Sequence, residues 1–548
     1  MNQHAIVVIT GKLGAGKSGL AHALQETYGF RVHAPRAMQS AGRPAESGDT
    51  ASFATAQRLA FEQAILTEIL EGVQKLGEAE PGLVVDGAPS SSVVNQLRSR
   101  FTGRLTHVHL YASRERLHAT YMDGDGAAPG APSYEEVDVL SEEEVDALKA
   151  DADVRISTTR SDHGDTLVRV AAHLHLLTSP DVRCVDVLVG GQYGSEGKGN
   201  IVAYLANEYD VLVRVGGPNA GHTVANASGK AIHHQLPSGA SFSKASLVLG
   251  PGFTINVEKL LAEIHQFRIE QERIFIDPQA TIIEQEDIAE EGGGVVGAIA
   301  STGSGSGAAK ARRIRHRGSL SSPVRLAKHI PELASFLRPT EEVLEEAYRF
   351  RRSVLLEGTQ GSALSLYHGT YPYVTSRDTN VAGCLAEAGI SPSRVRKILM
   401  VVRTTPIRVA NPDGEEGHVS GSLKNETTFE EVARKAKLVA DDVVAAEITS
   451  TTRRKRRVGW FEWREFRRAC NLNAPTDIVL TFVDYLDQAN QQARRFDQLA
   501  VDTIKFIEEV ERVAQAPVSL INTRFPQKDA DFDDLRSIID RRNWTARS

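Results

Sequence analysis

Short apolar, β-branched segments recur along the chain, and two of them lead through glycines into a helical pattern. Residues 5–10 precede a helical pattern at 19–28, and residues 185–189 precede one that begins at 201–205. Residues 105–110 form a further run, which includes a threonine and two histidines. An apolar run without polar alternation is typical of a strand that is buried on both faces, between layers of helices. The pattern therefore predicts an α/β fold with mostly parallel sheets.

The chain of 548 residues is too long for one ordinary hydrophobic core, so we expect at least two domains. A turn containing a proline at residues 179–184 separates a helical pattern at 165–177 from the strand that begins at 185. We therefore expect a first domain over residues 1–178 and a second over residues 185–548.

Composition adds few constraints. Hydrophobic residues make up 41% and charged residues 24%, as in ordinary globular proteins, and a net charge of -7 predicts no general affinity for nucleic acid. Cys184, Cys384 and Cys470 lie far apart without metal-ligand spacing, which favours buried thiols in a reducing compartment. No signal peptide and no apolar run long enough for a bilayer is recognisable, so we expect a cytoplasmic protein without membrane partners.

A glycine-rich phosphate-binding motif follows the first apolar segment. Residues 11–18 read Gly-Lys-Leu-Gly-Ala-Gly-Lys-Ser, a complete P-loop pattern placed between a strand and a helix. Its backbone N–H groups would cradle phosphates, Lys17 would reach the β/γ oxygens, and Ser18 would bind Mg²⁺. The alternative is a chance match or a loop that has lost its function. The nucleotide-binding candidates are Gly11, Gly14, Gly16, Lys17, Ser18 and Asp86, which ends another apolar segment.

The rest of the first domain resembles small nucleoside-monophosphate and dephospho-coenzyme A kinases. The resemblance rests on the segment 105–110 and on Ser-Arg-Glu-Arg at 113–116, which match the strand and lid start of those kinases. It covers residues 1–178 and implies a three-layer P-loop domain with a second, kinase activity. Its acceptor is not indicated by the sequence.

The apolar segment 185–189 leads into a rarer glycine-rich string. Residues 192–199 read Gln-Tyr-Gly-Ser-Glu-Gly-Lys-Gly, with a spacing unlike that of the P-loop. The string closely resembles the nucleotide loop of adenylosuccinate synthetases, in which Ser195 is replaced by a catalytic aspartate. The resemblance implies catalytic roles for Ser195 and Lys198, and nucleotide binding by Gly194, Glu196, Gly197 and Gly199.

Further motifs extend this resemblance over residues 185–548. Residues 216–223 read Gly-Gly-Pro-Asn-Ala-Gly-His-Thr. The resemblance implies that His222 is the general acid, that Asn219 binds substrate and that the carbonyl of Gly221 binds Mg²⁺. A lone histidine is more often structural, but this one stands inside the family's motif.

Two segments resemble the family's contacts with the substrate phosphate. Residues 300–307 are rich in Gly and Ser, and the resemblance implies a phosphate contact by Thr302, whereas the segment taken alone reads as a flexible linker. The basic run 310–317 follows at the family's distance. There an arginine reaches the phosphate bound by the partner subunit of a homodimer, and the matching position is His316, next to Arg317.

Residues 356–361 and 369–376 match family strings almost word for word. The resemblance implies that Gln360 reads the purine through its amide, which both donates and accepts hydrogen bonds. It also implies that Thr375 binds the substrate phosphate.

The basic segment 447–460 has two interpretations. Charge alone favours a nucleic-acid patch or a targeting signal, whereas the resemblance implies a loop that binds the two carboxylates of L-aspartate through hydroxyls and arginines. Its candidates are Thr451, Thr452, Arg454 and Arg456. Residues 478–487 resemble the strand that reads the base of the phosphate donor; Asp484 is retained there, but Phe482 replaces a lysine.

The resemblance implies a doubly wound second domain and a two-step ligase reaction. The 6-oxygen of a purine nucleoside monophosphate attacks the γ-phosphate of ATP or GTP in the presence of Mg²⁺, and the amine of L-aspartate then displaces the phosphate. Ser195 lacks a basic carboxylate but leaves room for a 2-amino group, as in viral 2-aminoadenylosuccinate synthetases that act on dGMP. We therefore expect GMP or dGMP as substrate. The alternatives are IMP with a weaker base, or a nucleotide sensor without catalysis.

Overall fold

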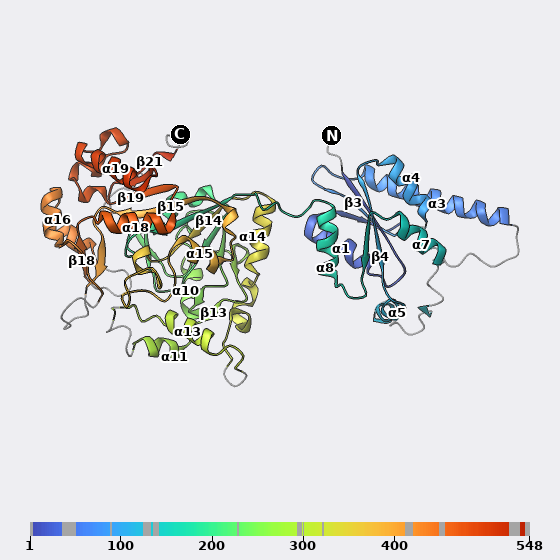
Figure 1. The fold of residues 1–548 in the computed structure, drawn as a ribbon, viewed down its shortest axis with the longest axis horizontal. Helices are drawn as coiled ribbons and strands as arrows, with labels where there is room; N and C mark the ends of the chain where they lie inside the picture. The colour runs from blue at the N-terminus through green and yellow to red at the C-terminus, as the bar shows by residue number, and fades with distance from the viewer. Residues whose placement is uncertain are drawn as a thin grey trace. The chain divides into compact units, whose positions relative to one another are not determined.

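The computed structural model describes residues 4–35, 51–87, 90–123, 133–134, 142–226, 229–292, 299, 301–319, 323–410, 420–448, 455–524 and 537–542. The chain divides into two compact units, Met1–Leu177 and Thr178–Ser548 (Figure 1). No helix in these ranges is both long enough and apolar enough to cross a bilayer.

The first unit is a five-stranded parallel sheet between two layers of helices. The strand order is β2-β3-β1-β4-β5. Alternate residues of the strands face opposite cores, one shared with α1 and α8 and the other with α3, α4 and α7. The elements are β1 (Ala5–Thr10), α1 (Lys17–Tyr28), β2 (Arg31–His33), α3 (Ala51–Gln74), β3 (Gly82–Asp86), α4 (Ser91–Arg100), β4 (Leu105–Tyr111), α5 (Arg114–Asp123), α7 (Glu142–Asp151), β5 (Val154–Ser157) and α8 (His163–His173).

The second unit is built on a nine-stranded sheet in the order β12-β10-β7-β14-β6-β15-β19-β20-β21. All neighbouring strands are parallel except β20 and β21. The strands are β6 (Val185–Gly190), β7 (Val211–Arg214), β10 (Ser246–Leu249), β12 (Ile274–Ile276), β14 (Val354–Glu357), β15 (Val395–Arg403), β19 (Asp477–Thr481), β20 (Val518–Asn522) and β21 (Ile538–Asp540). The predicted α/β class with mostly parallel sheets is confirmed.

Helices cover both faces of this sheet. One core contains residues of α14, α15, α18 and α19, and the other contains residues of α9 and α10. The helices are α9 (Lys198–Leu205), α10 (Val257–Gln266), α11 (Gln285–Glu290), α13 (Ser306–Arg315), α14 (Thr340–Arg349), α15 (Val381–Ala388), α16 (Phe429–Ala436), α17 (Ala440–Ala446), α18 (Trp463–Asn473) and α19 (Val501–Ala514). Three small sheets join β8 (His222–Asn226) to β9 (Gly229–His233), β11 (Thr254–Ile255) to β13 (Thr281–Ile282), and β16 (Ile407–Val409) through β18 (Arg456–Gly459) to β17 (Glu426–Thr427).

The strands next to the glycine-rich loops lie where the sequence predicted them. The predicted strands at 5–10 and 105–110 are β1 and β4, and the segment from 185 is β6. The run at 478–487 differs, because β19 ends at Thr481 and Phe482 adopts a left-handed backbone conformation with φ 59°. Asp484 consequently lies in a short 3₁₀ turn rather than on the strand.

Candidate active site

A cavity of about 220 Å³ lies beyond the carboxyl ends of β6, β7 and β14 in the second unit. This is the edge where open α/β sheets usually bind ligands. The predicted site residues that line it are Gly194, Ser195, Asn219, Gly221, His222, Thr302, Gln360, Thr375 and Arg456. Segments that lie far apart in the sequence are therefore brought together around one space.

The loop between β6 and α9 is held in shape by a buried ion pair. The Glu196 carboxylate accepts the N–H groups of Gln192 at 3.0 Å and Gly194 at 2.9 Å, and it pairs with Lys198 Nζ at 2.6 Å. Both charged side chains are only 1% exposed. Glu196 and Lys198 thus lie beneath the loop and outside the cavity lining, and the following Gly197 and Gly199 begin α9.

Gly194 shows why this turn needs glycine. Its φ is 104°, and an added Cβ would lie 3.2 Å from the Cα of Gln360. The loop after β6 and the loop after β14 therefore touch backbone to backbone, which places Ser195 and Gln360 around the same cavity.

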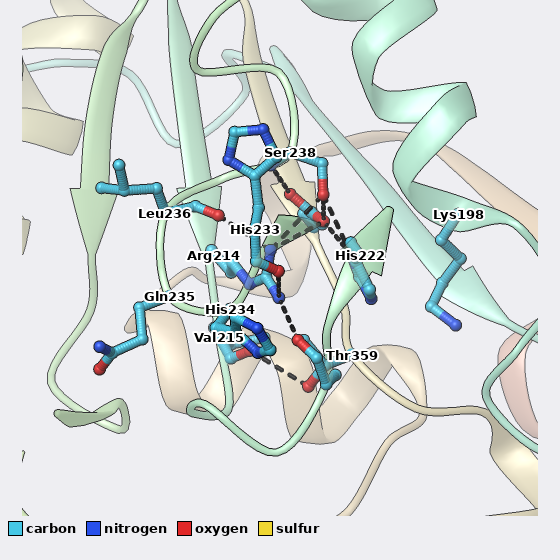
Figure 2. Close-up of polar contacts among 12 residues, drawn as sticks. Lys198, Arg214, Val215, His222, His233, His234, Gln235, Leu236, Ser238 and Thr359 are labelled. Carbon is cyan, nitrogen blue, oxygen red and sulfur yellow. Dashed lines mark hydrogen bonds and ion pairs between the residues drawn. The ribbon is translucent and has the colours of Figure 1, made fainter. Parts of the chain in front are cut away.

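His222 is anchored by a buried carboxylate at the end of β14. Its Nδ1 lies 2.5 Å from Glu357 and 3.0 Å from the Ser238 hydroxyl. Ser238 also donates its backbone N–H to Glu357 at 2.8 Å. Figure 2 shows His222 and Ser238 grouped with Arg214, whose guanidinium lies 3.5 Å from the Glu357 carboxylate. The imidazole is therefore fixed in orientation before any ligand binds.

The charges of this group follow from its burial. Burial and the neighbouring Arg214 lower the pKa of His222 to about 4. Burial opposes ionisation of Glu357, but Arg214 and the hydrogen bonds from His222 and Ser238 outweigh it and lower the pKa of this carboxyl to about 2. At neutral pH a neutral imidazole thus donates its Nδ1–H to a carboxylate. Its Nε2 is buried and has no hydrogen-bond partner among the described residues.

Arg214 also fixes the backbone around His222. Its guanidinium donates to the carbonyl oxygens of Leu236 at 2.8 Å, Ala220 at 2.9 Å and His233 at 3.3 Å. These carbonyls belong to the loop before β8 and to the end of the β8–β9 hairpin and the turn that follows it. One fully buried side chain of β7 thus ties the predicted Asn-Ala-Gly-His segment to the sheet.

The glycine- and serine-rich segment before α13 forms the opposite wall. Thr302 lines the cavity, and its hydroxyl oxygen is buried without a partner among the described residues. The N-terminus of α13 is already occupied by the Glu291 carboxylate, which accepts the N–H groups of Gly305 at 2.7 Å and Gly307 at 2.6 Å. Asn219 accepts a hydrogen bond from the Ser304 hydroxyl, which joins the two loops.

His316 and Arg317 follow the last turn of α13 and are absent from the cavity lining. The cations on the helix itself have partners within the described residues. Lys310 pairs with Glu387 at 2.5 Å and Arg312 pairs with Asp287 at 2.8 Å. Within the single chain the basic run thus contributes mainly to the packing of α13.

Gln360 has its amide oriented by two donors. Its Oε1 accepts from the Thr359 hydroxyl at 2.9 Å and from Arg377 at 3.5 Å, and Arg377 is held by Glu387 at 2.9 Å. Because the amide oxygen is engaged in this network, the NH₂ group is the end left for a ligand. A ligand carbonyl oxygen in the cavity would match that donor.

Arg408 of β16 and Arg456 of β18 line one side of the cavity. Glu447 joins Arg403 and Arg456, each at 2.7 Å, and Tyr485 donates to the same carboxylate at 2.8 Å. Burial disfavours the charged form of Glu447, but the two arginines prevail and lower its pKa to about 2. Thr451, Thr452 and Arg454 lie outside the described residues.

Asp484 is buried away from the cavity lining. It is 3% exposed, and its Oδ1 has no hydrogen-bond partner in the described part of the chain. Burial raises the pKa of this carboxyl to about 7. Phe482 stacks under the guanidinium of Arg403 at 4.6 Å, next to Gly197 of the glycine-rich loop.

The oxygens of the cavity suit a magnesium ion that arrives with a triphosphate. Ser195 and the backbone at Gly221 offer neutral oxygens, and no cluster of three or more His, Cys, Asp or Glu residues that could hold a metal occurs in the described ranges. Mg²⁺ commonly combines one or two protein oxygens with substrate phosphates. These residues therefore fit a nucleotide-borne ion better than an ion held by protein alone.

In the first unit the predicted phosphate loop lies between β1 and α1. Gly11, Gly14 and Gly16 all have positive φ angles, and Lys17 Nζ donates to the carbonyl of Lys12 at 3.0 Å. The Ser18 hydroxyl donates to Asp86 at 2.6 Å. Ser18, which the sequence assigned to Mg²⁺, thus contacts Asp86, another of the nucleotide-binding candidates.

Sequence reasoning missed several parts of the second site. Glu357, the partner of His222, was read only as part of a family string. Tyr193 and Arg408 both line the cavity, and the Arg408 guanidinium lies 4.5 Å from the Tyr193 ring centre. A charged residue at the end of the otherwise apolar strand β14 was the available signal for Glu357.

Known proteins resemble the second unit closely. The adenylosuccinate synthetase family model matches residues 187–324 and 321–491. The adenylosuccinate synthetase of Methanocaldococcus jannaschii is 35% identical over 353 residues, which are 62% of this chain and 93% of the relative. That of Pyrococcus horikoshii is 35% identical over 365 residues, 65% of this chain and 98% of the relative.

Two solved structures have the same fold. Succinoaminodeoxyadenylate synthetase of cyanophage S-2L, bound to dGMP and to dATP as an energy donor, is 27% identical with a TM-score of 0.52, over 66% of this chain and 95% of that one. Fully ligated adenylosuccinate synthetase of Plasmodium falciparum is 20% identical with a TM-score of 0.53, over 65% of this chain and 99% of that one. The family model alone spans more than half of the chain, so this protein belongs to the adenylosuccinate synthetase family, whose ligases join aspartate to a purine nucleotide.

Proposed function

We propose that the second unit joins L-aspartate to the 6-position of a 2-amino purine nucleoside monophosphate, GMP or dGMP, with Mg²⁺ and ATP or GTP. The observation that carries this proposal is the presence of Ser195 in the cavity beside His222, Gln360 and Thr302. The likeness to a phage synthetase bound to dGMP and dATP supports the same substrate class.

The residues of the cavity divide the work between binding and proton transfer. The 6-oxygen of the purine attacks the γ-phosphorus while the N1 proton passes to water, and the nucleoside diphosphate leaves; the aspartate amine then attacks C6 and gives up a proton to water, and the phosphate leaves. Gln360 donates its amide N–H to the 6-oxygen, while Thr302 and Thr375 hold the 5′-phosphate. Arg456, with Thr451, Thr452 and Arg454, binds the carboxylates of aspartate. Mg²⁺ supplies positive charge that stabilises the transferring phosphoryl group.

His222 must gain a proton before it can act as an acid. Its neutral imidazole holds Nδ1–H on Glu357, so the buried Nε2 carries the lone pair of the ring. The negative charge of an incoming triphosphate raises the pKa of the ring and favours protonation at Nε2. Glu357 then stabilises the imidazolium. His222→Ala should lower the rate by roughly 10²–10⁴-fold, whereas general acid catalysis by another group would leave it nearly unchanged.

Ser195 favours a 2-amino purine for a steric and a polar reason. It is smaller than the aspartate of the ordinary family pattern, and its hydroxyl accepts a hydrogen bond from an exocyclic amine. One flexible hydroxyl gives much less discrimination than the roughly 10⁴–10⁵-fold of a fully built polar site. We expect GMP or dGMP to exceed IMP in kcat/KM.

Product analysis by mass spectrometry tests this assignment. IMP, GMP and dGMP are each incubated with L-aspartate, Mg²⁺ and either ATP or GTP. The proposal expects aspartate-dependent products from GMP or dGMP, and the donor that supports them identifies the triphosphate. Turnover of IMP alone would give an atypical adenylosuccinate synthetase, and phosphate release without aspartate would reject the ligase.

The specificity step has its own variant. Ser195→Asp should move the preference toward IMP by about tenfold or more, because it restores a base and fills space near the 2-position. Ser195→Ala is the matched control, which keeps the space and removes the acceptor. An unchanged substrate order in Ser195→Asp would contradict the role of this residue.

For the first unit we propose nucleoside triphosphate binding at the loop of residues 11–18. The contact between Ser18 and Asp86 beside Lys17 supports it. For the second unit we propose a homodimer, in which His316 and Arg317 act at the partner's substrate phosphate, because neither lines the cavity of its own chain. Analytical ultracentrifugation tests the dimer.

A further inference from the structure

The first unit contains a cavity of about 320 Å³ that takes no part in the ligase site. It lies where the chain leaves β4, between the start of the glycine-rich loop and α7, and α7 packs against β4 (Figure 1). Its polar lining consists of Lys12, His109, Tyr111, Asp146 and Lys149.

The topology of the sheet favours a ligand at this place. In the strand order β2-β3-β1-β4-β5, the connection from β1 runs to β2 on one side of the pair, and the connection from β4 runs through α5 and α7 to β5 on the other side. In open α/β sheets ligands bind outside the carboxyl ends of the strands where the connections diverge in this way. The cavity opens at that point.

The cavity shares a wall with the glycine-rich loop. Gly11 has φ 140°, and a Cβ added there would lie 2.1 Å from the carbonyl oxygen of Leu110, so the loop crosses the end of β4 in direct contact. Lys12 follows at once and lines the cavity, while its carbonyl accepts from Lys17 Nζ at 3.0 Å. Lys12 therefore belongs to both the loop and the cavity.

A buried histidine leaves one ring nitrogen unused in this wall. The Thr10 hydroxyl bonds to Nε2 of His107 at 2.7 Å and to Nδ1 of His109 at 2.9 Å. His109 is 0% exposed, and its Nε2 has no partner among the described residues. Burial lowers the pKa of His109 to about 4, so the ring is neutral at pH 7. An unpartnered buried nitrogen is costly unless a ligand or water bonds to it.

The remaining charges favour a dianion. Lys12 of the glycine-rich loop and Lys149 of α7 supply two ammonium groups to the lining, against the single carboxylate of the exposed Asp146. The Lys149 ammonium lies 4.1 Å from the centre of the Tyr111 ring, which keeps it at the cavity. Lysine ammonium groups are common phosphate ligands, and the volume suits a small organic molecule.

We propose that this cavity binds a small phosphate monoester, whose dianionic phosphate contacts Lys12 and Lys149 and whose hydroxyl or amino group bonds to His109. It is a second ligand site of the first unit, beside the triphosphate site proposed for residues 11–18. This proposal rests on the proposed triphosphate binding only in that it calls the cavity a second site, because the cavity and its lining are present whether or not residues 11–18 bind a triphosphate.

Hydrogen–deuterium exchange of the full chain tests the site locally. Ribose 5-phosphate, GMP and inorganic phosphate are added separately at equal concentrations, and peptides over residues 105–112 and 142–151 are followed. At least one ester should slow exchange there several-fold, and inorganic phosphate should do so less. No protection by either ester would overturn the proposal, and equal protection by inorganic phosphate would overturn its ester part.

Variants separate this site from its neighbours. Lys149→Gln should abolish the ester protection and Lys149→Arg should retain it, while Arg155→Gln, which removes an exposed cation outside the lining, should leave it intact. Unchanged exchange of β1 and β3 without ligand shows that each variant is folded. Lys17→Met should lose protection of residues 11–18 by ATP and keep protection by the ester. Ester protection that persists in Lys149→Gln would overturn the site.

Discussion

The two glycine-rich loops of this chain place their lysines in different electrostatic surroundings. In the first unit the half-buried Lys17 donates to the backbone carbonyl of Lys12, and Asp86 accepts from the Ser18 hydroxyl. In the second unit Lys198 pairs with Glu196, and both side chains are buried. Similar glycine-rich patterns thus give one loop whose acid lies on a neighbouring strand and one loop that contains its own neutralising acid.

This difference affects how far each loop is ordered before a ligand binds. The Glu196 carboxylate already accepts two N–H groups of the second loop, so that loop has its shape before a phosphate arrives. Breaking a buried pair leaves an uncompensated charge, which is far more costly than losing a hydrogen bond near the surface. Replacement of Lys198 should therefore mainly lower stability, whereas replacement of Lys17 should mainly weaken ligand binding.

The largest expected effect is on stability. Lys198→Met should cost the second unit about 3–5 kcal/mol of unfolding free energy, because Glu196 is left buried without its cation. Lys17→Met, the matched change in the first unit, should cost less, because Lys17 is only half-buried whereas Lys198 and Glu196 are each 1% exposed. Denaturant-dependent hydrogen exchange of β6 and β1 measures the two units separately. Equal losses in both units would contradict the contrast.

A buried carboxyl group near the second loop, Asp484, should make stability depend on pH. Burial raises the pKa of Asp484 from 3.8 to about 7, so the folded state keeps a proton that the unfolded state releases. The stability of the wild type therefore falls as pH rises between these values, and the deficit persists above them. Asp484→Asn should gain up to about 4 kcal/mol relative to wild type between about pH 4 and 8.

Urea unfolding of wild type and Asp484→Asn across that pH range is the measurement. Two curves that stay parallel would show that Asp484 does not change its protonation on folding. Asp484 also contrasts with Asp86, the acid next to the first loop, because Asp86 accepts from the exposed Ser18 hydroxyl.

The smallest expected effect concerns binding at the first loop. Lys17→Met should weaken ATP binding there by roughly 10–100-fold, since it removes charge-assisted hydrogen bonds to the phosphates. Photo-crosslinking of the full chain with an azido-ATP, mapped to peptides of each unit, reports this loss. Crosslinking of residues 11–28 that is unchanged in the variant would reject the phosphate loop.

The sequence predicted those elements that depend on residues close together in the chain. The strand β1 is apolar up to Thr10, and the residues of β3 before Asp86 are likewise apolar, so both strands could be recognised in the sequence. The family strings likewise anticipated that Ser195, His222 and Gln360 share a cavity.

Long-range pairings were beyond the sequence. Glu357 meets His222 across 135 positions, which only the adjacency of β7 and β14 brings about. The stack of Arg408 on Tyr193 depends on β16, outside the main sheet, and the left-handed turn at Phe482 breaks a run that looked like one strand. Each depends on tertiary packing rather than on spacing.

The carboxylate at the start of α13 has a thermodynamic consequence for ligand affinity. Glu291 occupies the helix N-terminus that a phosphate would otherwise use, and it orders Gly305 and Gly307 in advance. A phosphate that approaches this segment therefore gains few hydrogen bonds from those amides. Because the segment is already ordered, little conformational entropy is lost when the phosphate binds. For the phosphate contact that we propose at Thr302, selectivity would come from the hydroxyl, so recognition there would depend on shape and hydrogen-bond geometry more than on ionic strength.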